Sequence, residues 1–399
     1  MALILSARAS ALAPSVTLSL DARAKELRAC GLDIISFGSG EPDFATPEYI
    51  REAAKAAVDQ GMTHYTPVAG TLELRKEICK KLERDNGLSY APTQVLVSDG
   101  AKHALFNALT ALINPGDEVL LPSPCWVSYP EMVRMTGGVP VSVPGREEDD
   151  FLVGADGLRP FVTERTKALI LNSPGNPAGG VYSRERLAEI GRLAVERGFY
   201  VISDEIYEKL VYDGAEHVSI ASLSDDIQAQ TIVVNSLSKT YAMTGWRVGY
   251  AAGPQNVIRA MTAFQSHTAS NANSIAQYAA QAALCGDGTW IRDMVAEFDA
   301  RRKLMHARIG EIPGLSARLP RGAFYMLLNI SALIGRSHDG QVITGSESFA
   351  DLLLNSKRVA VIPAKAFGTD AHVRLSYAAS RQSIEIGMDR IADFVAELR

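Results

Sequence analysis

Two periods of hydrophobic and polar positions alternate along this 399-residue chain. Apolar residues recur at helical spacing in residues 49–60, 72–86, 102–113 and 184–196. Short apolar runs, typical of strands, occupy residues 94–98, 118–121, 167–171, 200–203, 231–235 and 248–252. Because helices and strands alternate through the middle of the chain, we expect an α/β fold with a mainly parallel central sheet flanked by helices.

The pattern changes towards the C-terminus. A long charged segment, residues 289–310, predicts an extended helix, and a smaller α+β unit follows it. We therefore predict a large domain over residues 49–295 and a small domain over residues 296–399. Residues 335–348 are rich in Gly and Ser and predict a surface loop.

Composition narrows the class of protein. The chain is 47% hydrophobic and 21% charged, with a net charge of −5, and its basic residues are dispersed among acidic ones, so nothing points to nucleic-acid binding. No apolar run approaches the roughly 20 residues that span a bilayer. The four cysteines are widely spaced without a CxxC pair, which favours free thiols in a reducing cytoplasm: Cys30, Cys79, Cys125 and Cys285.

The most informative segment is Ser-Leu-Ser-Lys-Thr-Tyr-Ala-Met-Thr-Gly-Trp-Arg, which ends at Arg247 and contains Lys239. It follows the strand predicted at residues 231–235, and open α/β sheets bind ligands at strand ends. Hydroxyl side chains and an arginine can hold a phosphate group, and nearby cations or burial make a lysine amine a better nucleophile. The segment therefore predicts a covalent amine beside a phosphate site, against the alternative of an exposed lysine in a polar loop.

This segment resembles the cofactor-lysine signature of fold-type I pyridoxal-phosphate enzymes, and specifically that of class I aminotransferases. The resemblance runs from about residue 14 to the C-terminus. It implies that Lys239 holds pyridoxal 5′-phosphate covalently and then moves the substrate Cα proton to C4′ of the cofactor. It also implies a ping-pong reaction, and a small domain to which the N-terminal residues 1–48 contribute.

Asp204 and Tyr207 follow the strand predicted at residues 200–203. Asp204 alone would be read as the cap of a following helix. The resemblance instead implies that Asp204 pairs with the pyridine nitrogen of the cofactor, which makes the ring an electron sink. It implies that Tyr207 donates a hydrogen bond to the phenolate oxygen of the cofactor.

Two further residues are assigned to the cofactor ring. Asn176 lies in a proline-fixed turn, Asn-Ser-Pro-Gly-Asn-Pro-Ala-Gly, that would otherwise be an ordinary loop. The resemblance makes it a second donor to the phenolate, although Ala178 stands where the family often has threonine. Trp126 offers a flat face to the ring, against the alternative of core packing.

A strand-to-helix turn at residues 98–103 would direct backbone amides at an anion. Simple strand-to-helix geometry is the alternative. With the lysine segment, this turn completes a predicted phosphate cup formed by Gly100, Ala101, Lys102, Ser236, Ser238 and Arg247.

Arg374 lies in the alternating run His-Val-Arg-Leu-Ser-Tyr, where a buried guanidinium fits a planar carboxylate. The resemblance makes it the clamp for the substrate α-carboxylate, against a structural salt bridge, and makes Gly40 a substrate contact. Tyr65 matches a tyrosine that reaches the phosphate of a neighbouring subunit. A homodimer with shared active sites follows from that match.

Substrate preference is assigned from the prokaryotic aspartate aminotransferase subgroup, which this chain resembles. Lys102 is the candidate partner of a distal carboxylate, and Ser15 and Thr17 match a mobile arm that closes over the substrate. Some members that also use prephenate carry lysine where Ala13 stands. We expect amino transfer from L-aspartate to 2-oxoglutarate, with aromatic amino acids and prephenate as alternatives.

Three other functions remain open from the sequence. A pyridoxal-phosphate-dependent lyase would use the same cofactor residues. A cofactor-bound transcription regulator would need a basic helix-turn-helix segment before the domain, and the chain has none. A dinucleotide-dependent oxidoreductase would need a G-x-G-x-x-G turn after an early strand, which is also missing. No metal ligand is predicted.

Overall fold

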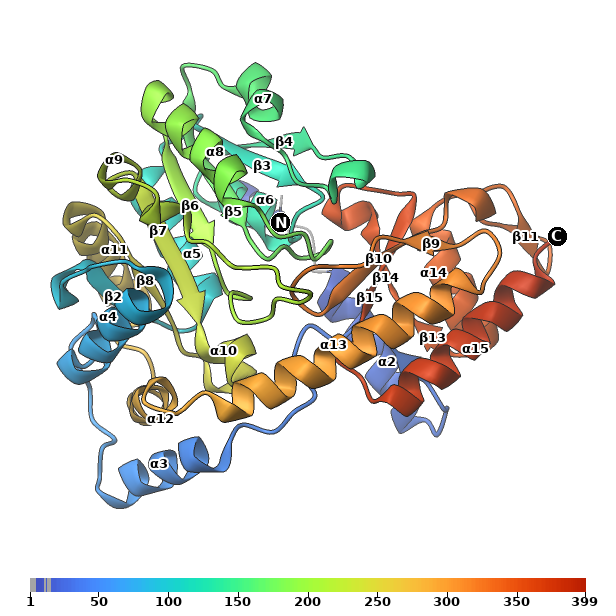
Figure 1. Ribbon diagram of the computed structural model, residues 1–399, viewed down its shortest axis with the longest axis horizontal. Coiled ribbons are helices and arrows are strands. Elements are labelled where there is room, and N and C mark those ends of the chain that lie inside the picture. Colours follow the sequence, from blue (N-terminus) through green and yellow to red (C-terminus); the bar gives the residue numbers. More distant parts are fainter. Residues whose placement is uncertain (1–4, 11, 13–15) are drawn as a thin grey trace, which may run out of the picture.

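The structure, a computed structural model, describes residues 5–10, 12 and 16–399. Figure 1 shows a large part built around a seven-stranded sheet and a smaller part at the C-terminal end. Helix α13 (Thr289–Gly310) extends from one part to the other. This helix includes residue 295, where we divided the chain, and the division into domains stays a prediction.

The seven strands of the large sheet have the order β2-β8-β7-β6-β5-β3-β4. Only β8 is antiparallel to its neighbours, so the predicted mainly parallel sheet is confirmed. In that order, the strands are β2 (Val95–Ser98), β8 (Gly249–Ala252), β7 (Thr231–Ser236), β6 (Tyr200–Asp204), β5 (Thr166–Asn172), β3 (Glu118–Ser123) and β4 (Val139–Pro144).

Strand β5 shows why the strands are apolar throughout. Ala168 and Ile170 pack into one hydrophobic cluster with residues of α5 (Ala101–Leu112) and α11 (Gln255–Thr268), whereas Leu169 and Leu171 pack into another with α8 (Arg184–Arg197). Successive side chains of a strand point to opposite faces. Because helices cover both faces, the strand has no polar side, as parallel sheets require.

Helices of the large part begin and end at recognisable signals. In α8 the Ser183 hydroxyl accepts a hydrogen bond from the Arg186 N–H, and Gly198 ends the helix in the left-handed conformation. The other helices of this part are α3 (Glu48–Asp59), α4 (Leu72–Asn86), α6 (Ser128–Met135), α7 (Ala155–Leu158), α9 (Asp225–Gln228), α10 (Leu237–Thr240) and α12 (Ser274–Leu284). Single 3₁₀ turns occupy Pro92–Gln94, Glu147–Asp149, Arg159–Phe161, Ile220–Ser222 and Thr244–Trp246.

The smaller part is built on an antiparallel sheet of four strands. Its order is β14 (Ile362–Pro363), β15 (His372–Ser376), β10 (Tyr325–Asn329) and β9 (Ser316–Ala317). Helices α14 (Ser346–Lys357) and α15 (Arg381–Glu397) pack here, with 3₁₀ turns at Ser331–Leu333 and Ala364–Phe367. The N-terminal segment holds α1 (Ala7–Ser10) and α2 (Val16–Ala29), and it joins this part where β1 (Ile35–Ser36) pairs with β13 (Val359–Ala360).

One expectation was wrong. Residues 335–348 are not a continuous loop, because β11 (Ser337–His338) pairs with β12 (Gln341–Val342) and α14 begins at Ser346. The Ser346 side chain donates to Asp370, which fixes the start of that helix despite its Gly and Ser content.

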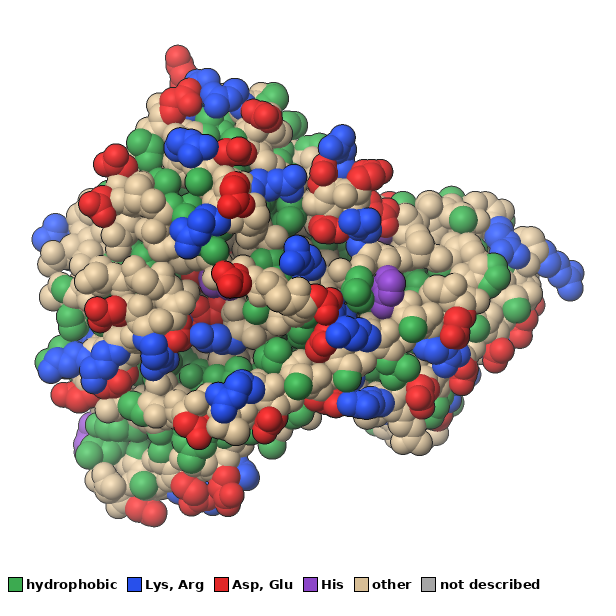
Figure 2. Space-filling view, viewed as in Figure 1, with side chains coloured by type: hydrophobic (Ala, Val, Ile, Leu, Met, Phe, Trp, Pro, Cys, Tyr) green, Lys and Arg blue, Asp and Glu red, His purple; other side chains and the backbone are tan. Residues whose placement is uncertain are grey.

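The surface agrees with the composition. Acidic and basic side chains are interspersed over the face seen in Figure 2. All four cysteines are free thiols. No helix within the described residues has both the length and the apolar character needed to cross a membrane.

Candidate active site

A cavity of about 460 Å³ lies at the carboxyl ends of β5, β6 and β7, where the large and smaller parts meet. Eleven of the predicted site residues line it: Gly40, Ala101, Lys102, Trp126, Asn176, Asp204, Tyr207, Ser238, Lys239, Arg247 and Arg374. The cavity lining thus combines residues from opposite ends of the chain. Its chemistry depends on how each charged group is held.

Lys239 reaches the cavity from α10, the short helix that follows β7. Its Nζ donates to the carbonyl oxygen of Gly40 at 2.5 Å. Burial lowers the pKa of the Lys239 amine to about 8. The positive charges of Arg247 and Arg374 also lower this pKa, whereas the carboxylates of Glu41 and Asp204 raise it. A larger share of this amine is therefore neutral near pH 7 than for an exposed lysine, and the neutral amine is the nucleophile.

Asp204 is the last residue of β6 and is only 3% exposed. Its Oδ2 accepts a hydrogen bond from the Tyr129 hydroxyl at 2.6 Å, and its Oδ1 accepts one from the Ile206 N–H at 3.3 Å. Burial raises the pKa of this carboxyl to about 6, although both hydrogen bonds oppose the shift. A turn rather than a helix follows Asp204, so the helix-cap alternative is wrong.

Tyr207 lies three residues further on and is buried. Its hydroxyl is 3.0 Å from the hydroxyl of Tyr325, and its ring packs edge-on against Phe324 and Tyr325. Burial raises the pKa of the Tyr207 phenol well above its ordinary value. The group is therefore a neutral hydrogen-bond donor at the cavity wall.

Arg374 is 98% buried in the middle strand β15 of the smaller sheet. Its Nη1 donates to Asn176 Oδ1 at 3.1 Å and its Nη2 donates to the Gly38 carbonyl oxygen at 3.0 Å, while its Nε has no hydrogen-bond partner. The guanidinium lies 4.3 Å from the ring centroid of Tyr325. Among the described residues it forms no ion pair with a carboxylate, so the salt-bridge alternative is not what the structure shows.

The N-terminus of α5 faces the cavity beside two further groups that bind anions. Ala101 and Lys102 form its first turn, and the Ser238 side chain lines the cavity next to Arg247. The Arg247 guanidinium donates to the backbone carbonyls of Thr244 and Asp99, which hold it against Gly100.

Gly100 is needed for this approach. Its φ of 83° is in the left-handed region, and a Cβ there would lie 2.4 Å from Arg247 Nη2. A helix N-terminus, a hydroxyl and a guanidinium around one corner form a site for a phosphate-like anion.

Trp126 and Lys102 are in contact at the other side of the opening. The Lys102 Nζ lies 4.8 Å from the Trp126 ring centroid, and Trp126 packs edge-on against Tyr129. Burial lowers the pKa of the Lys102 amine, and Arg247 lowers it further. Lys102 therefore lines the same cavity as Arg374, with its ammonium group over the indole of Trp126.

Five predicted residues are not shown to line the cavity. Gly100 caps α5 behind Arg247, and the Ser236 hydroxyl instead accepts a hydrogen bond from the Ser238 N–H. Tyr65 is 91% exposed and is not part of the cavity lining, so its role across a dimer stays a prediction. Ser15 lies outside the described residues; Thr17 belongs to α2, but its side chain is not among those described.

Sequence reasoning missed residues that hold the predicted ones in place. Tyr129 donates to Asp204, Tyr325 meets Tyr207 and Arg374, and Asn172 donates to the Asp204 carbonyl oxygen at 3.0 Å. Only Asn172 had a usable signal, because it ends a predicted strand beside the Asn176 turn. Tyr325 lies in an apolar run, and Tyr129 lies between a serine and a proline, so neither context indicates a partner in the site.

Comparisons with known proteins agree with this geometry. The sequence matches the family described as aminotransferase class I and II over residues 32–391. It is 46% identical over 391 residues to an aspartate aminotransferase of Geobacillus stearothermophilus, covering 98% of each chain. It is 44% identical over 387 residues to an aspartate/prephenate aminotransferase of Cereibacter sphaeroides, covering 96% of this chain and 97% of that one.

Solved structures give the same result. The aspartate aminotransferase of Rhizobium meliloti superposes with a TM-score of 0.96 at 38% identity, covering 100% of both chains. That of Thermus thermophilus, solved with maleate, has a TM-score of 0.93 at 42% identity and covers 98% of this chain and 100% of its own.

Proposed function

We propose that this chain, which belongs to the class I and II aminotransferase family, transfers the amino group of L-aspartate to 2-oxoglutarate with pyridoxal 5′-phosphate as its cofactor. The observation that carries the proposal is the pair of cations in one cavity. Arg374 is a buried guanidinium that lacks an acidic partner among the described residues, and Lys239 is an amine whose pKa is lowered to about 8. A buried, unpaired cation needs an anionic ligand, and a carboxylate matches its planar fork.

The residues present fit pyridoxal 5′-phosphate. The corner at the α5 N-terminus, Ser238 and Arg247 suits the phosphate group, and Asp204 offers a buried carboxyl for a ring nitrogen that bears a proton. Asn176 keeps its side-chain oxygen on Arg374, which leaves its amide N–H₂ for an acceptor in the cavity. When bound, the cofactor supplies an aldehyde and an electron sink for the bond that breaks at the substrate Cα.

Each side chain of the cavity has its own role in the proposed amino transfer. Arg374 holds the α-carboxylate and thereby orients the Cα–H bond of the amino acid. Lys239, as a free amine, would take the Cα proton and deliver it to C4′ of the cofactor, on the other side of the amino nitrogen. Asp204 keeps the ring nitrogen protonated, and Tyr207 and Asn176 hold the phenolate oxygen. Trp126 covers one face of the ring and excludes water.

Preference for a dicarboxylate depends on Lys102. Its amine lies over Trp126 at the opening of the cavity, where a second carboxylate of the substrate would lie. The relatives named as aspartate aminotransferases and the one solved with the dicarboxylate maleate support this assignment. The relatives named as aspartate/prephenate aminotransferases keep prephenate open as a second amino acceptor.

The proposal includes the remaining assignments from the sequence. These are a homodimer in which Tyr65 completes the phosphate site of the partner subunit, closure of an arm with Ser15 and Thr17 over the substrate, a small domain formed by residues 1–48 and 296–399, and a cytoplasmic location. Gly40 contributes through its backbone, since its carbonyl oxygen already accepts from Lys239.

The direct test is a panel of amino donors. We expect the purified chain to take up pyridoxal 5′-phosphate, to absorb in the visible range, and to transfer amino groups from aspartate and glutamate faster than from tyrosine, phenylalanine or alanine, with 2-oxoglutarate or oxaloacetate as acceptor. Parallel lines in double-reciprocal plots would show the ping-pong order. Release of pyruvate and ammonia in place of amino transfer would identify a lyase, and a protein that stays colourless would refute the proposal.

Lys102 gives a second prediction, on selectivity. Lys102→Ala removes one charge-assisted contact with the distal carboxylate, worth about 1.5–3 kcal/mol. We expect kcat/KM for aspartate to fall about 10- to 150-fold, whereas kcat/KM for alanine, which has no distal carboxylate, changes little. Lys102→Arg keeps the cation and serves as the matched control. An equal loss for both donors would show that Lys102 acts on the cofactor and not on the substrate.

A further inference from the structure

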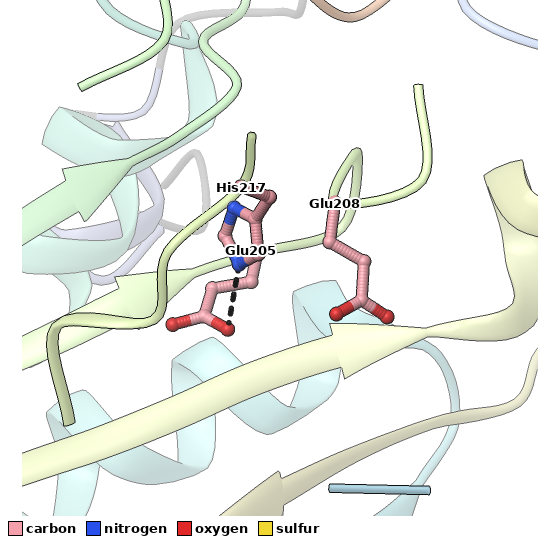
Figure 3. Close-up of side chains that lie close together, drawn as sticks. All are labelled: Glu205, Glu208 and His217. Atoms are coloured by element: carbon pink, nitrogen blue, oxygen red, sulfur yellow. Dashed lines mark hydrogen bonds and ion pairs between the residues drawn. The ribbon is translucent and has the colours of Figure 1, made fainter. Parts of the chain in front are cut away.

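A cluster of buried ionisable side chains lies behind the turn that carries the active-site residues. Glu205, Glu208 and His217 place their ligand-type atoms within 4.8 Å of one another, as Figure 3 shows. Glu205 is 1% exposed and Glu208 is 6% exposed, and neither lines the cavity. With Lys81 of α4 these residues form what we call the rear cluster.

Glu205 is held on both carboxylate oxygens. Its Oε1 accepts hydrogen bonds from Ser203 at 2.8 Å and Ser219 at 2.6 Å, and its Oε2 lies 3.1 Å from His217 Nε2. Since a carboxylate only accepts hydrogen bonds, His217 carries its proton on Nε2. Three donors from the strand β6 and the 217–219 segment therefore converge on one side chain of the turn.

Glu208 is held by α4. One oxygen forms an ion pair with the Lys81 ammonium, and the other accepts from Asn86 Nδ2 at 3.0 Å. Lys81 also donates to Asn86 Oδ1 at 2.7 Å. The Lys81 ammonium already supplies a cation to Glu208, and hydrogen bonds already hold Glu205, so the rear cluster is an internal network rather than a metal site.

The sheet supports the start of the turn, where the Glu205 N–H donates to the carbonyl oxygen of Val234 in β7 at 2.9 Å. Asp204 is the last residue of β6 in register, opposite Asn172 on one side and Val234 on the other. Tyr207 lies beyond that register, and its backbone depends on the turn itself. Asp204 and Tyr207 line the cavity, whereas Glu205 and Glu208, each one residue further along, lie away from it. The rear cluster thus holds Glu205 and Glu208, which flank the cavity-lining pair Ile206 and Tyr207.

We propose that Glu205 and Glu208 are positioning residues that hold Tyr207 in place through the rear cluster. The contact of 3.0 Å with Tyr325 holds the hydroxyl of Tyr207, and edge-on packing against Phe324 and Tyr325 holds its ring. The rear cluster holds the chain on both sides of it, through Glu205 and Glu208. The effect on turnover rests on the proposed function, because it requires that Tyr207 acts on the cofactor. The claim that the rear cluster fixes the position of Tyr207 does not depend on that function.

The first experiment needs no cofactor. In a crystal structure of unliganded Glu205→Gln, an amide N–H₂ replaces an acceptor opposite the His217 N–H, and we expect the turn to shift enough to break the Tyr207–Tyr325 hydroxyl contact. The matched control is Glu118→Gln. Glu118 is also buried, at 5% exposed, and pairs with Arg165 and Thr163 at the start of β3, the opposite end of the sheet. That variant should lose stability and keep the contact.

The second experiment is a double-mutant cycle with pyridoxal 5′-phosphate. A displaced Tyr207 misaligns the site, so we expect Glu205→Gln to lower turnover about 10-fold and to move the pH midpoint of the bound cofactor's absorbance in the same direction as Tyr207→Phe. In the double variant the two effects should not add, whereas those of Glu118→Gln and Tyr207→Phe should add. Ser219→Ala, which removes a single donor to Glu205, replaces Glu205→Gln in both experiments if the latter does not fold.

Additive effects, an unshifted midpoint or an intact Tyr207–Tyr325 contact would each overturn the positioning role. A wild-type protein that binds no pyridoxal 5′-phosphate would instead contradict the proposed function. The crystallographic comparison would still decide whether the rear cluster holds Tyr207 in place.

Discussion

Replacing Lys239 by alanine is expected to lower the rate of amino transfer by about 10⁴-fold, the upper end of what a positioned general base contributes. The reason is that one amine has two tasks. In the proposed function it binds the aldehyde of the cofactor, which its lowered pKa of about 8 favours, and it carries the proton between two carbon atoms. Steady-state kinetics with aspartate and 2-oxoglutarate measure the loss.

The variant should still bind pyridoxal 5′-phosphate, because Ser238, Arg247 and the α5 N-terminus remain. We expect a dissociation constant that is measurable by dialysis and a visible spectrum of the free-aldehyde form. A small primary amine added to the solution should restore part of the proton transfer, since it can occupy the space that the side chain leaves.

Lys239→Arg is the matched control for charge. A guanidinium keeps the positive charge and cannot become neutral at any pH in the working range. If Lys239→Arg were as active as the wild type, the lysine would act only as a cation, and the proposed chemistry would be wrong.

The sequence was sufficient for the elements of the large part. Residues 72–86 and 289–310 are the helices α4 and α13, as their periodicity predicts, and the six predicted strands are all present within two residues at each end. Their apolar composition reflects burial on both faces, which is a local property of each strand. The orientation of β8 and the pairing of β1 with β13 depend on partners far along the chain, and no local pattern specifies them.

In the candidate site, too, contacts between residues far apart in the chain could not be predicted from the sequence. Lys239, Asp204 and Arg374 stand in recognisable motifs, because covalent and ionic chemistry needs particular residue types at particular positions. Tyr129 and Tyr325 work by position alone: one donates to Asp204 from 75 residues away and the other touches Tyr207 from 118 residues away.

The role of Ser236 stays a prediction. Its hydroxyl accepts a hydrogen bond from the Ser238 N–H at the start of α10, and its own O–H remains free to donate to a phosphate.

The second large effect concerns Arg374. Arg374→Lys keeps the charge but loses the two-pronged fork, so one charge-assisted hydrogen bond to the α-carboxylate is lost, worth about 1.5–3 kcal/mol. We expect kcat/KM for every amino acid to fall about 10- to 150-fold, mostly through KM. The affinity for pyridoxal 5′-phosphate should be unchanged, because a cation still lies near Lys239 and the phosphate corner is untouched.

Arg302 offers a matched control because it too is fully buried, yet it is satisfied within the protein. Its nitrogens donate to Asp213, Asp299 and the carbonyl oxygen of Pro320. Arg302→Lys should therefore lower the melting temperature and leave KM for amino acids unchanged. Arg374 has no acidic partner among the described residues, so its variant should show the reverse pattern. If both variants lost only stability, Arg374 would be a structural residue, and the carboxylate would have to be bound by another cation of the cavity.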